Sequence, residues 1–327
     1  MSQSSTPELS VIIPYYGEYP HIHYTLQSVW TELGDMVDFE VILVDNDPRT
    51  PSQNERTLRV LTDDWKRTPW IRFVKYTDKP SNWGARNCGV RHTKGEYLLF
   101  LDAHSLISPG SVLSMYQNYR TLNNGDYVTH LPISDFFSPT WKEYEILYDP
   151  QRGILHHGNV PYRRSDFPRT VPASPACGLL CRRDHITEDL EYWPDELGQY
   201  GGGENYFNWV MALLGRKILI HPKTPIYHWH IPREWSRDHV PTPLSWAVNI
   251  LIATYLLGGE DWAARLVRHA PETFYPVNSV PHDKLHGALM EILKTEPLRE
   301  RRERLLSRAI TTVDNLGDWV KQWEVAA

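Results

Sequence analysis

The chain has 327 residues, which is enough for one large domain or for a domain with an appendage. The hydrophobic content of 41% and the charged content of 23% are those of a globular protein, and the net charge of −6 argues against broad attraction to nucleic acid. Three cysteines with no C-x-x-C pair argue against a disulfide framework and favour a reducing compartment. The amino terminus has no signal-peptide pattern, so we expect a cytoplasmic protein.

Up to residue 105, short apolar strands alternate with helical patterns. The sequence predicts strands at 9–14, 39–44, 71–76 and 97–101, and helices at 19–33, 52–65 and 82–92. This alternation predicts an α/β fold with a parallel sheet between two layers of helices. In such sheets ligands bind at the carboxyl ends of the strands, where Asp45 and Asp102 both stand.

After residue 105 the pattern is less regular. The expected elements are helices at 110–122 and 205–214 and strands at 127–131, 176–182, 218–221 and 226–229. The polar, proline-rich stretch 138–175 is predicted to be a long loop. From residue 241 the pattern is helical, with helices expected at 244–257, 261–269, 283–294 and 298–323. The run 244–257 is too short to span a bilayer comfortably, so we expect a buried helix and no membrane span.

The apolar strand at 97–101 leads directly to Asp102 and His104. If the strand geometry continues to His104, both side chains point to the same side of the sheet. A carboxylate and an imidazole there can hold a divalent cation, and the nitrogen ligand suits Mn²⁺ better than Mg²⁺. Taken alone, the pair also fits an aspartate that caps a turn beside a loop histidine.

Neighbouring motifs strengthen the metal interpretation. The segments SVIIPYYGE (10–18), VILVDND (41–47) and GARNCGVRHTKGEYLLFLDAH (84–104) together resemble the GT-A nucleotide-sugar glycosyltransferases. Farther on, the segment GGEN (202–205) and the spacing from Pro222 to His228 resemble the retaining polypeptide N-acetylgalactosaminyltransferase type, although Gly201 stands where that family has tryptophan. The resemblance covers residues 8–230.

The resemblance implies a GT-A fold: a central, mostly parallel sheet with helices on both faces, followed here by a helical extension. We therefore expect a glycosyltransferase catalytic domain over residues 1–240, without a lectin domain, and an extension over 241–327. The extension is expected to pack on the catalytic domain or to form a homodimer contact. Its charged run, 296–306, is interpreted as a solvated helix face.

The resemblance also implies a ligand set for one Mn²⁺ or Mg²⁺, made of Asp102, His104 and His228, with His230 as the alternative to His228. It further implies that a UDP-sugar donor contacts Pro14, Tyr15, Glu18, Asp45, Arg86, Asp102, Ala103 and Gly203.

Several of these donor contacts have expected roles. Tyr15 or Tyr16 is expected to stack on the base. Asp45 is expected to accept a hydrogen bond from the base or ribose, which favours uridine over cytidine. Arg86 is expected to pair with a phosphate or the sugar, and Asn87 to support its loop.

Glu204 and Asn205 open a predicted helix directly after three glycines and, with Asp102, are the predicted catalytic residues. In an inverting enzyme Glu204 would be the general base for the acceptor hydroxyl. In a retaining enzyme the departing phosphate oxygen takes that proton, and the two side chains grip donor sugar hydroxyls. The resemblance favours retention. The histidine pairs at 21/23 and 156/157 have no nearby acid motif and are interpreted as surface or loop residues.

The sequence leaves the acceptor open among a protein Ser/Thr hydroxyl, a sugar hydroxyl and a hydroxymethylated base in DNA of the phage type. Six arginines between residues 151 and 184 (152, 163, 164, 169, 182 and 183) favour DNA, because basic charge with aromatics is typical of a polyanion groove. The predicted function is therefore transfer of a hexosyl or N-acetylhexosaminyl group from a UDP-sugar to an acceptor hydroxyl. A catalytically inactive GT-A binding module is the alternative from a different class.

Overall fold

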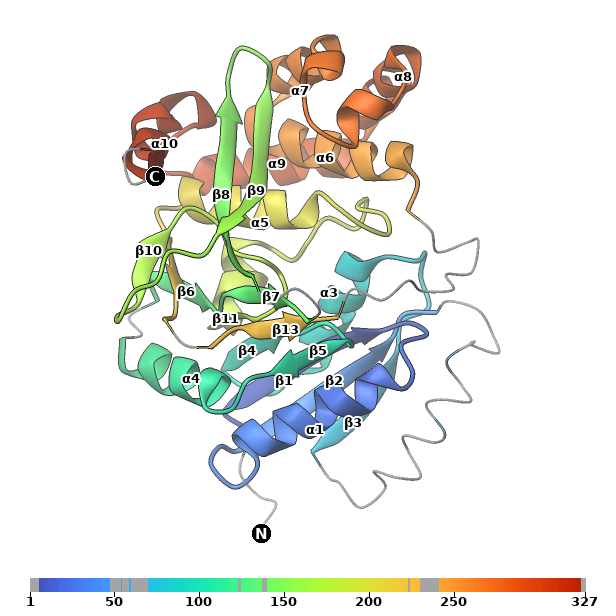
Figure 1. The fold of residues 1–327 in the computed structure, drawn as a ribbon. Coiled ribbons are helices and arrows are strands. Elements are labelled where there is room, and N and C mark those ends of the chain that lie inside the picture. The colour runs from blue at the N-terminus through green and yellow to red at the C-terminus, as the bar shows by residue number, and fades with distance from the viewer. Residues whose placement is uncertain are drawn as a thin grey trace.

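The computed structural model describes residues 6–47, 54, 59, 70–122, 125–136, 140–222, 224–229 and 241–324 (Figure 1). Of the helix expected at 52–65 only residues 54 and 59 are described, and the alternative ligand His230 lies outside the described residues.

An 8-stranded sheet forms the centre of the molecule, in the order β10-β12-β6-β11-β4-β1-β2-β3. The strands β1, β2, β3 and β4 run parallel to one another. In contrast, β11 lies between β4 and β6 and is antiparallel to both. The strands are β1 (Leu9–Tyr15), β2 (Phe39–Asp45), β3 (Ile71–Lys75), β4 (Tyr97–Phe100), β6 (Tyr127–His130), β10 (Arg169–Val171), β11 (Leu179–Arg182) and β12 (Lys217–Ile220). All but β10 were predicted from the sequence.

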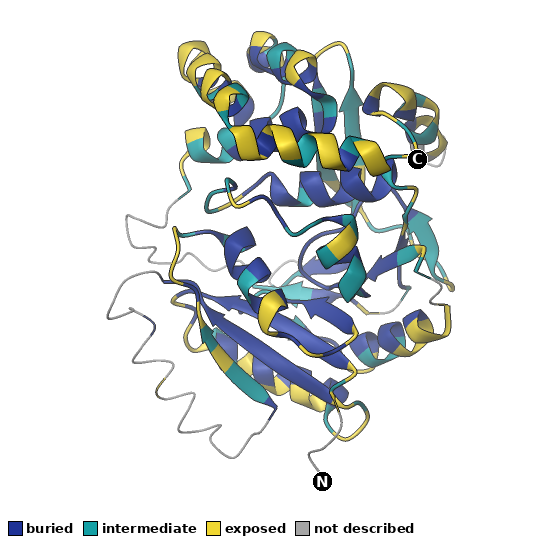
Figure 2. Ribbon diagram, turned by 180° about the vertical axis from the view of Figure 1, so that it is seen from behind, coloured by how far each residue is buried: buried dark blue, intermediate teal, exposed yellow. Residues whose placement is uncertain are grey.

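Helices cover both faces of this sheet because its strands carry apolar side chains on both sides. Alternate residues of β1, such as Val11 and Ile13, pack with α1 (His21–Leu33) and α4 (Ser111–Leu122). Ile12, between them, points to the opposite face, in the core that includes α3 (Asn82–His92) and α5 (Gly203–Leu213). Figure 2 shows the central strands buried and many exposed residues on the outer faces of the surrounding helices.

A second, 5-stranded sheet in the order β5-β13-β7-β8-β9 lies beside the first. Its strands are β5 (Ser105–Ile107), β7 (Ile133–Asp135), β8 (Trp141–Asp149), β9 (Ile154–Pro161) and β13 (Ile226–His228). The prediction of a long loop over 138–175 is wrong, because β8 and β9 form an antiparallel hairpin there. The charged residues within β8 interrupt its apolar pattern, so the hydrophobicity of the sequence did not predict this strand.

One of those charges, Glu143 of β8, is buried and paired with two arginines from the chain that follows the hairpin. Arg163 Nε donates to Glu143 Oε1 at 2.9 Å, and Arg169 donates to Glu143 Oε2. Only 1% of the Glu143 side chain is exposed, so the carboxylate depends on these partners for its solvation. The pairing holds β8 against the segment that leads into β10.

We expect Glu143→Gln to lower the free energy of unfolding by about 2 kcal/mol, because two arginines lose their buried counter-charge. Urea denaturation measures the effect. Glu145→Gln changes an exposed carboxylate on the same strand and is expected to stay within about 0.5 kcal/mol of the wild type. Equal effects of the two substitutions would contradict this account of the hairpin.

Most of the arginines that favoured a DNA acceptor have partners inside the protein. Arg163 and Arg169 bind Glu143, as described above. Arg152 pairs with Asp149, Arg182 pairs with Asp184, and Arg183 donates to backbone carbonyls. These contacts engage much of the basic charge of the segment within the protein, which weakens the argument from composition for a polyanion groove.

The C-terminal extension consists of the helices α6 (Pro243–Gly258), α7 (Glu260–Arg268), α8 (His282–Lys294), α9 (Glu296–Arg308) and α10 (Gly317–Glu324). The prediction of a single helix at 298–323 is wrong. The helix α9 ends at Arg308, and the Ile310 N–H that follows it donates to the carbonyl of Leu213 at the end of α5. As predicted, the apolar run in α6 is a buried helix. Among the described helices, none has the length and apolar character needed to cross a membrane.

The extension shares one hydrophobic core with the sheet, which includes side chains of β9, α5 and α6 to α9. It also makes polar contacts, since α9 packs against the segment after β11. There, Arg301 Nη1 donates to the carbonyls of Glu191 and Tyr192, and Arg304 pairs with Glu191 at 2.9 Å. The charged run of α9 therefore contacts the rest of the chain on one side and is not simply a solvated face.

Candidate active site

A turn between β4 and β5 carries Asp102 and His104. The strand geometry does not continue to His104, because β4 ends at Phe100 and residues 103 and 104 form a turn. Thr25 of α1 holds this turn by donating its hydroxyl to the carbonyl of Ser105 at 2.7 Å and accepting the Ser105 N–H. The turn, rather than the alternation of side chains along a strand, therefore places Asp102 and His104 near each other.

His228 joins them from the end of β13, which pairs with β5 so that His228 lies opposite Ser105. His228 Nε2 is 3.0 Å from Asp102 Oδ2 and 2.9 Å from His104 Nε2. One ligand atom from each of the three residues lies within 4.8 Å of the others. Adjacent ligands about 2.1 Å from a single ion lie about 3 Å apart, so the spacing fits one divalent cation.

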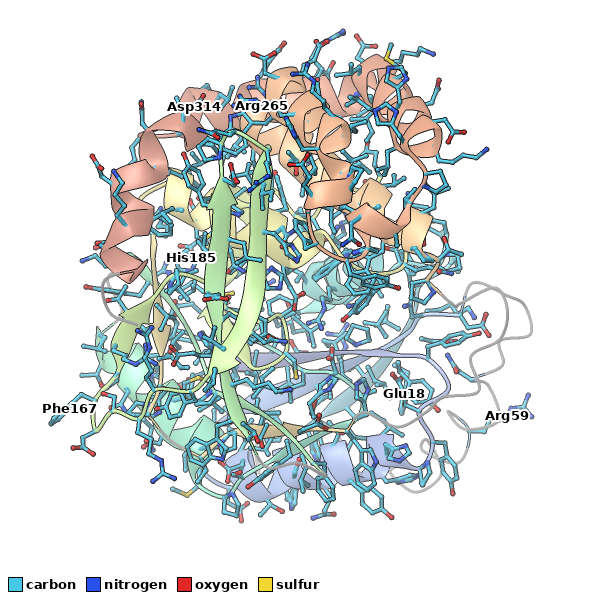
Figure 3. The ribbon with its side chains drawn as sticks, turned by 45° about the horizontal axis from the view of Figure 1, so that its top comes forward. Glu18, Arg59, Phe167, His185, Arg265 and Asp314 are labelled. Carbon is cyan, nitrogen blue, oxygen red and sulfur yellow. The ribbon has the colours of Figure 1, made fainter. Side chains whose placement is uncertain are left out.

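Behind these three residues, a second layer of side chains holds two of them in place. Arg86 Nη2 donates to Asp102 Oδ1 at 2.6 Å, and Glu18 Oε1 lies 3.3 Å from His104 Nδ1. The contact of Glu18 at Nδ1 turns His104 Nε2 toward the cluster, as carboxylate–histidine pairs do at metal centres. Figure 3 shows Glu18 beyond the end of β1.

The charge of Asp102 is strongly favoured by these neighbours. Burial by itself raises the pKa of this carboxyl, but the His228 hydrogen bond and the Arg86 charge outweigh it and hold the pKa well below its usual range. Asp102 is therefore a carboxylate at any physiological pH, which is the form that binds a cation.

Two of the predicted donor contacts are buried. Arg86 is 1% exposed and donates to Asp102 and to the Ala176 carbonyl, so it supports Asp102, and its pairing with a phosphate or the sugar stays a prediction. Tyr15 is fully buried in the core between the sheet and α1, where its ring cannot stack on a base. Tyr16, at 9% exposure, is little more accessible.

Asp45 ends β2 directly opposite Tyr15 of β1. Its Oδ2 is 3.1 Å from Lys75 Nζ at the end of β3, and its Oδ1 accepts a hydrogen bond from Asn54 at 2.6 Å. Asn54 also accepts the Gly17 N–H and donates to the Tyr15 carbonyl. Lys75 and Asn54 were not singled out from the sequence. They orient the carboxylate at the edge where the strands end.

The remaining predicted donor contacts are backbone positions. Pro14 is buried in β1, and Ala103 lies in the turn with its carbonyl bound by Thr25 at 3.0 Å. Asn87 was expected to support its loop, but it lies within α3, where its amide exchanges two hydrogen bonds with the backbone of Trp193 and ties the helix to the segment before α5.

The glycines before Glu204 allow two helices, α3 and α6, to pack closely around the start of α5. Gly201 and Gly202 have positive φ angles of 81° and 74°. A Cβ on Gly201 would lie 1.9 Å from the Trp246 ring of α6, and one on Gly203 would lie 2.3 Å from the Trp83 ring of α3. Gly201 stands where the resembled family has a tryptophan. In this chain the ring of Trp246, from α6, packs on that glycine.

Ala176 connects Glu204 to the metal-ligand cluster. Its N–H donates to Glu204 Oε1 at 3.0 Å, and its carbonyl accepts a hydrogen bond from Arg86, the partner of Asp102. Burial, together with the charges of Glu204 and Asp102, raises the pKa of Tyr144 of β8. Glu204 and Asp102 thus belong to one site.

The interpretation of His156 and His157 as surface or loop residues is wrong. Both lie on β9, and both contact the side chain of Asn205, which is 1% exposed. The ring of His156 also stacks on Phe274 of the C-terminal extension, with the centroids 3.9 Å apart. Two consecutive histidines without an acid motif gave no sequence signal for this position, because the contact depends on the hairpin.

The central sheet with helices on both faces is the arrangement of the GT-A fold. Residues 10–187, more than half of the chain, match the family described as glycosyl transferase family 2, and the chain belongs to that family. This confirms, at the level of the family, the glycosyltransferase class predicted from the sequence.

Curated relatives cover different parts of the chain. The poly(ribitol-phosphate) beta-N-acetylglucosaminyltransferase TarP of Staphylococcus aureus (strain N315) is 30% identical over 122 residues, which cover 37% of this chain and 35% of TarP. Polypeptide N-acetylgalactosaminyltransferase 15 of Mus musculus is 23% identical over 292 residues, which cover 83% of this chain and 43% of that protein. The chain thus matches less than half the length of either relative.

Solved structures confirm the predicted GT-A fold. GalNAc-T7 with UDP, GalNAc and Mn²⁺ superimposes with a TM-score of 0.63 at 16% identity, over 89% of this chain and 55% of that one. TarS 1-349 of S. aureus in complex with UDP-GlcNAc gives a TM-score of 0.58 at 15% identity, over 98% of this chain and 88% of that one.

Proposed function

We propose that this chain transfers a sugar from a UDP-sugar to an acceptor hydroxyl, using a divalent cation held by Asp102, His104 and His228. The observation that carries the proposal is the convergence of these three ligand atoms within 4.8 Å at the edge where the central strands end. Two structures with this fold support the choice of donor: GalNAc-T7 contains UDP, GalNAc and Mn²⁺, and TarS contains UDP-GlcNAc.

When bound, the cation would neutralise charge on the donor diphosphate. The chain's own residues prepare the site for that role. Arg86 keeps Asp102 ionised and fixed, and Glu18 fixes the ring of His104. Because Arg86 and His104 are both buried, these orientations do not depend on flexible surface side chains.

The uridine end of the donor is proposed to lie at Asp45. Its carboxylate is oriented by Lys75 and Asn54, and a carboxylate has capacity for further hydrogen bonds, including one from a uracil N–H. Ala103 and Gly203 bring backbone close to the region between Asp102 and Glu204, where the diphosphate and the sugar are proposed to lie.

Transfer is proposed to proceed with retention, as in the family that the GGEN segment resembles. Glu204 and Asn205 would then bind hydroxyls of the donor sugar, while the departing phosphate oxygen takes the acceptor proton. The alternative mechanism is inversion, in which Glu204 acts as the general base for the acceptor hydroxyl. The anomeric coupling constant of the purified product, measured by NMR, distinguishes the two.

The acceptor is proposed to be a hydroxyl of a saccharide, a polyol or a protein. The named acceptors of the relatives are poly(ribitol-phosphate) and polypeptide. A hydroxymethylated DNA base ranks lower, because the arginines that suggested it bind groups within the protein. Free thiols at Cys88, Cys177 and Cys181 support a cytoplasmic location.

We expect release of UDP from one UDP-sugar in the absence of acceptor when Mn²⁺ is present, loss of release with EDTA, and recovery on adding Mn²⁺ back. A panel of nucleotide sugars with Mn²⁺, Mg²⁺ or EDTA measures this. His228→Ala removes a ligand and should abolish the metal dependence, whereas His269→Ala changes a histidine of the extension and should not. If no donor is hydrolysed and UDP with Mn²⁺ does not bind, the transferase proposal is refuted, and the alternative of an inactive GT-A binding module remains.

A further inference from the structure

Two consecutive histidines of β9 meet the side chain of Asn205. Asn205 Nδ2 lies 2.8 Å from His156 Nδ1, while Asn205 Oδ1 lies 2.5 Å from His157 Nδ1. Asn205 Oδ1 also lies 3.1 Å from His156 Nδ1, so one amide side chain contacts the Nδ1 atoms of both rings. The amide thereby fixes both rings.

The two rings have different surroundings. Burial, reinforced by the neighbouring His157, lowers the pKa of His156 to about 3, so His156 is neutral and packs flat against Phe274. His157 instead lies with its ring 5.4 Å from the ring of Tyr144, and its other nitrogen, Nε2, is 3.6 Å from Glu204 Oε2. His156 is a packing residue, whereas His157 faces the site.

The carboxylate of Glu204 is therefore contacted at both of its oxygens. The Ala176 N–H bonds to Oε1 at 3.0 Å, and His157 Nε2 approaches Oε2. The distance of 3.6 Å is longer than a hydrogen bond, but contacts at active sites commonly shorten when substrate binds. Since Asn205 fixes His157 Nδ1, the orientation of Nε2 is set before any ligand arrives.

We propose that His157 is a positioning residue for Glu204: with its ring held by Asn205, it fixes the direction of the outer carboxylate oxygen of Glu204. This inference rests on the proposed function, in which Glu204 contacts the donor sugar or the acceptor hydroxyl. His157 acts through Glu204 and does not belong to the cation ligand set. The sugar-transfer step then depends on β9 of the hairpin as well as on α5.

The test compares His157→Phe, which keeps a ring and removes both nitrogens, with His157→Gln, which keeps an amide able to reach Glu204. We expect His157→Phe to lower kcat about 10- to 100-fold with KM for the UDP-sugar little changed, and His157→Gln to recover most of the loss. Asn159→Ala, at an exposed position on the same strand, is the control and should match the wild type.

A double-substitution cycle separates positioning from a general structural role. In a Glu204→Gln background, His157→Phe is expected to lower kcat by less than about 2-fold, because the group it positions is already lost. A full additional loss in that background, or wild-type activity of His157→Phe alone, would overturn the inference. If His157→Phe does not fold, the same comparison is made with His157→Ala, which also removes both ring nitrogens. An inactive wild-type enzyme would instead refute the proposed function.

Discussion

Asp102→Asn is expected to lower metal-dependent turnover of the UDP-sugar about 1,000-fold, or ~4 kcal/mol in the barrier. The substitution keeps the size of the side chain but removes the negative charge that Arg86 and His228 contact. Calorimetry with UDP, with and without Mn²⁺, and steady-state turnover measure the two consequences. Binding of UDP should lose most of its dependence on Mn²⁺.

The matched control for Asp102→Asn is Asp184→Asn. Asp184 is also paired with an arginine, Arg182, and its pKa is also lowered, chiefly by the Arg182 hydrogen bond acting against burial. It neighbours His185, which lies on the other side of the hairpin from Glu18 (Figure 3). Turnover of Asp184→Asn should equal that of the wild type. Equal losses in both variants would show that general destabilisation, rather than loss of a cation ligand, lowers activity.

The lowered pKa of Asp102 also fixes the sign of its contribution to stability. Its pairing stabilises the folded state at pH values above about 4, the pKa of an unfolded aspartate, and this contribution is lost as the pH falls toward the lower, folded value. The effect of Asp102→Asn on turnover should therefore be the same across about pH 5 to 8.

Gly202→Ala is expected to lower the free energy of unfolding by about 3 kcal/mol and to abolish turnover. Gly202 has a φ of 74°, which strains any side chain, and a new Cβ would lie 2.4 Å from the Asn249 carbonyl oxygen of α6. The backbone of α6 cannot yield easily, because the Asn249 side chain also bonds to Gly198 and Tyr200. Relief of the clash must displace the loop that precedes Glu204.

The control for Gly202→Ala is Gly287→Ala, within α8. A Cβ there meets no atom within 4 Å, and alanine is the better helix former, so stability should rise by about 0.5–1 kcal/mol with turnover unchanged. Chemical denaturation of both variants checks the signs. A Gly202→Ala protein as stable and active as the wild type would show that the packing of α6 on the glycines does not position the site.

The parts of the fold that could be predicted from the sequence are those decided locally. The central strands are continuous apolar runs, and the helix over 82–92 has both of its ends where the sequence indicated. Asp102, His104 and His228, which the sequence predicts as one ligand set, do lie together, although a turn rather than a continuous strand brings the first two to the same place.

The parts that could not be predicted depend on partners far away in the chain. Glu143 is buried in a strand because Arg163 and Arg169, well beyond the next strand, neutralise it. Arg86 supports Asp102 from a different element, and His157 reaches Glu204 only because the hairpin crosses the start of α5. The break between α9 and α10 depends in the same way on a contact with α5, made by Ile310.

The most direct test of the account is a crystal grown with UDP and Mn²⁺ and measured for the anomalous scattering of manganese. The account predicts one strong peak among Asp102 Oδ2, His104 Nε2 and His228 Nε2, with the diphosphate beside it and the uracil at Asp45. A manganese peak at another place, or UDP bound without any metal at these three residues, would contradict it.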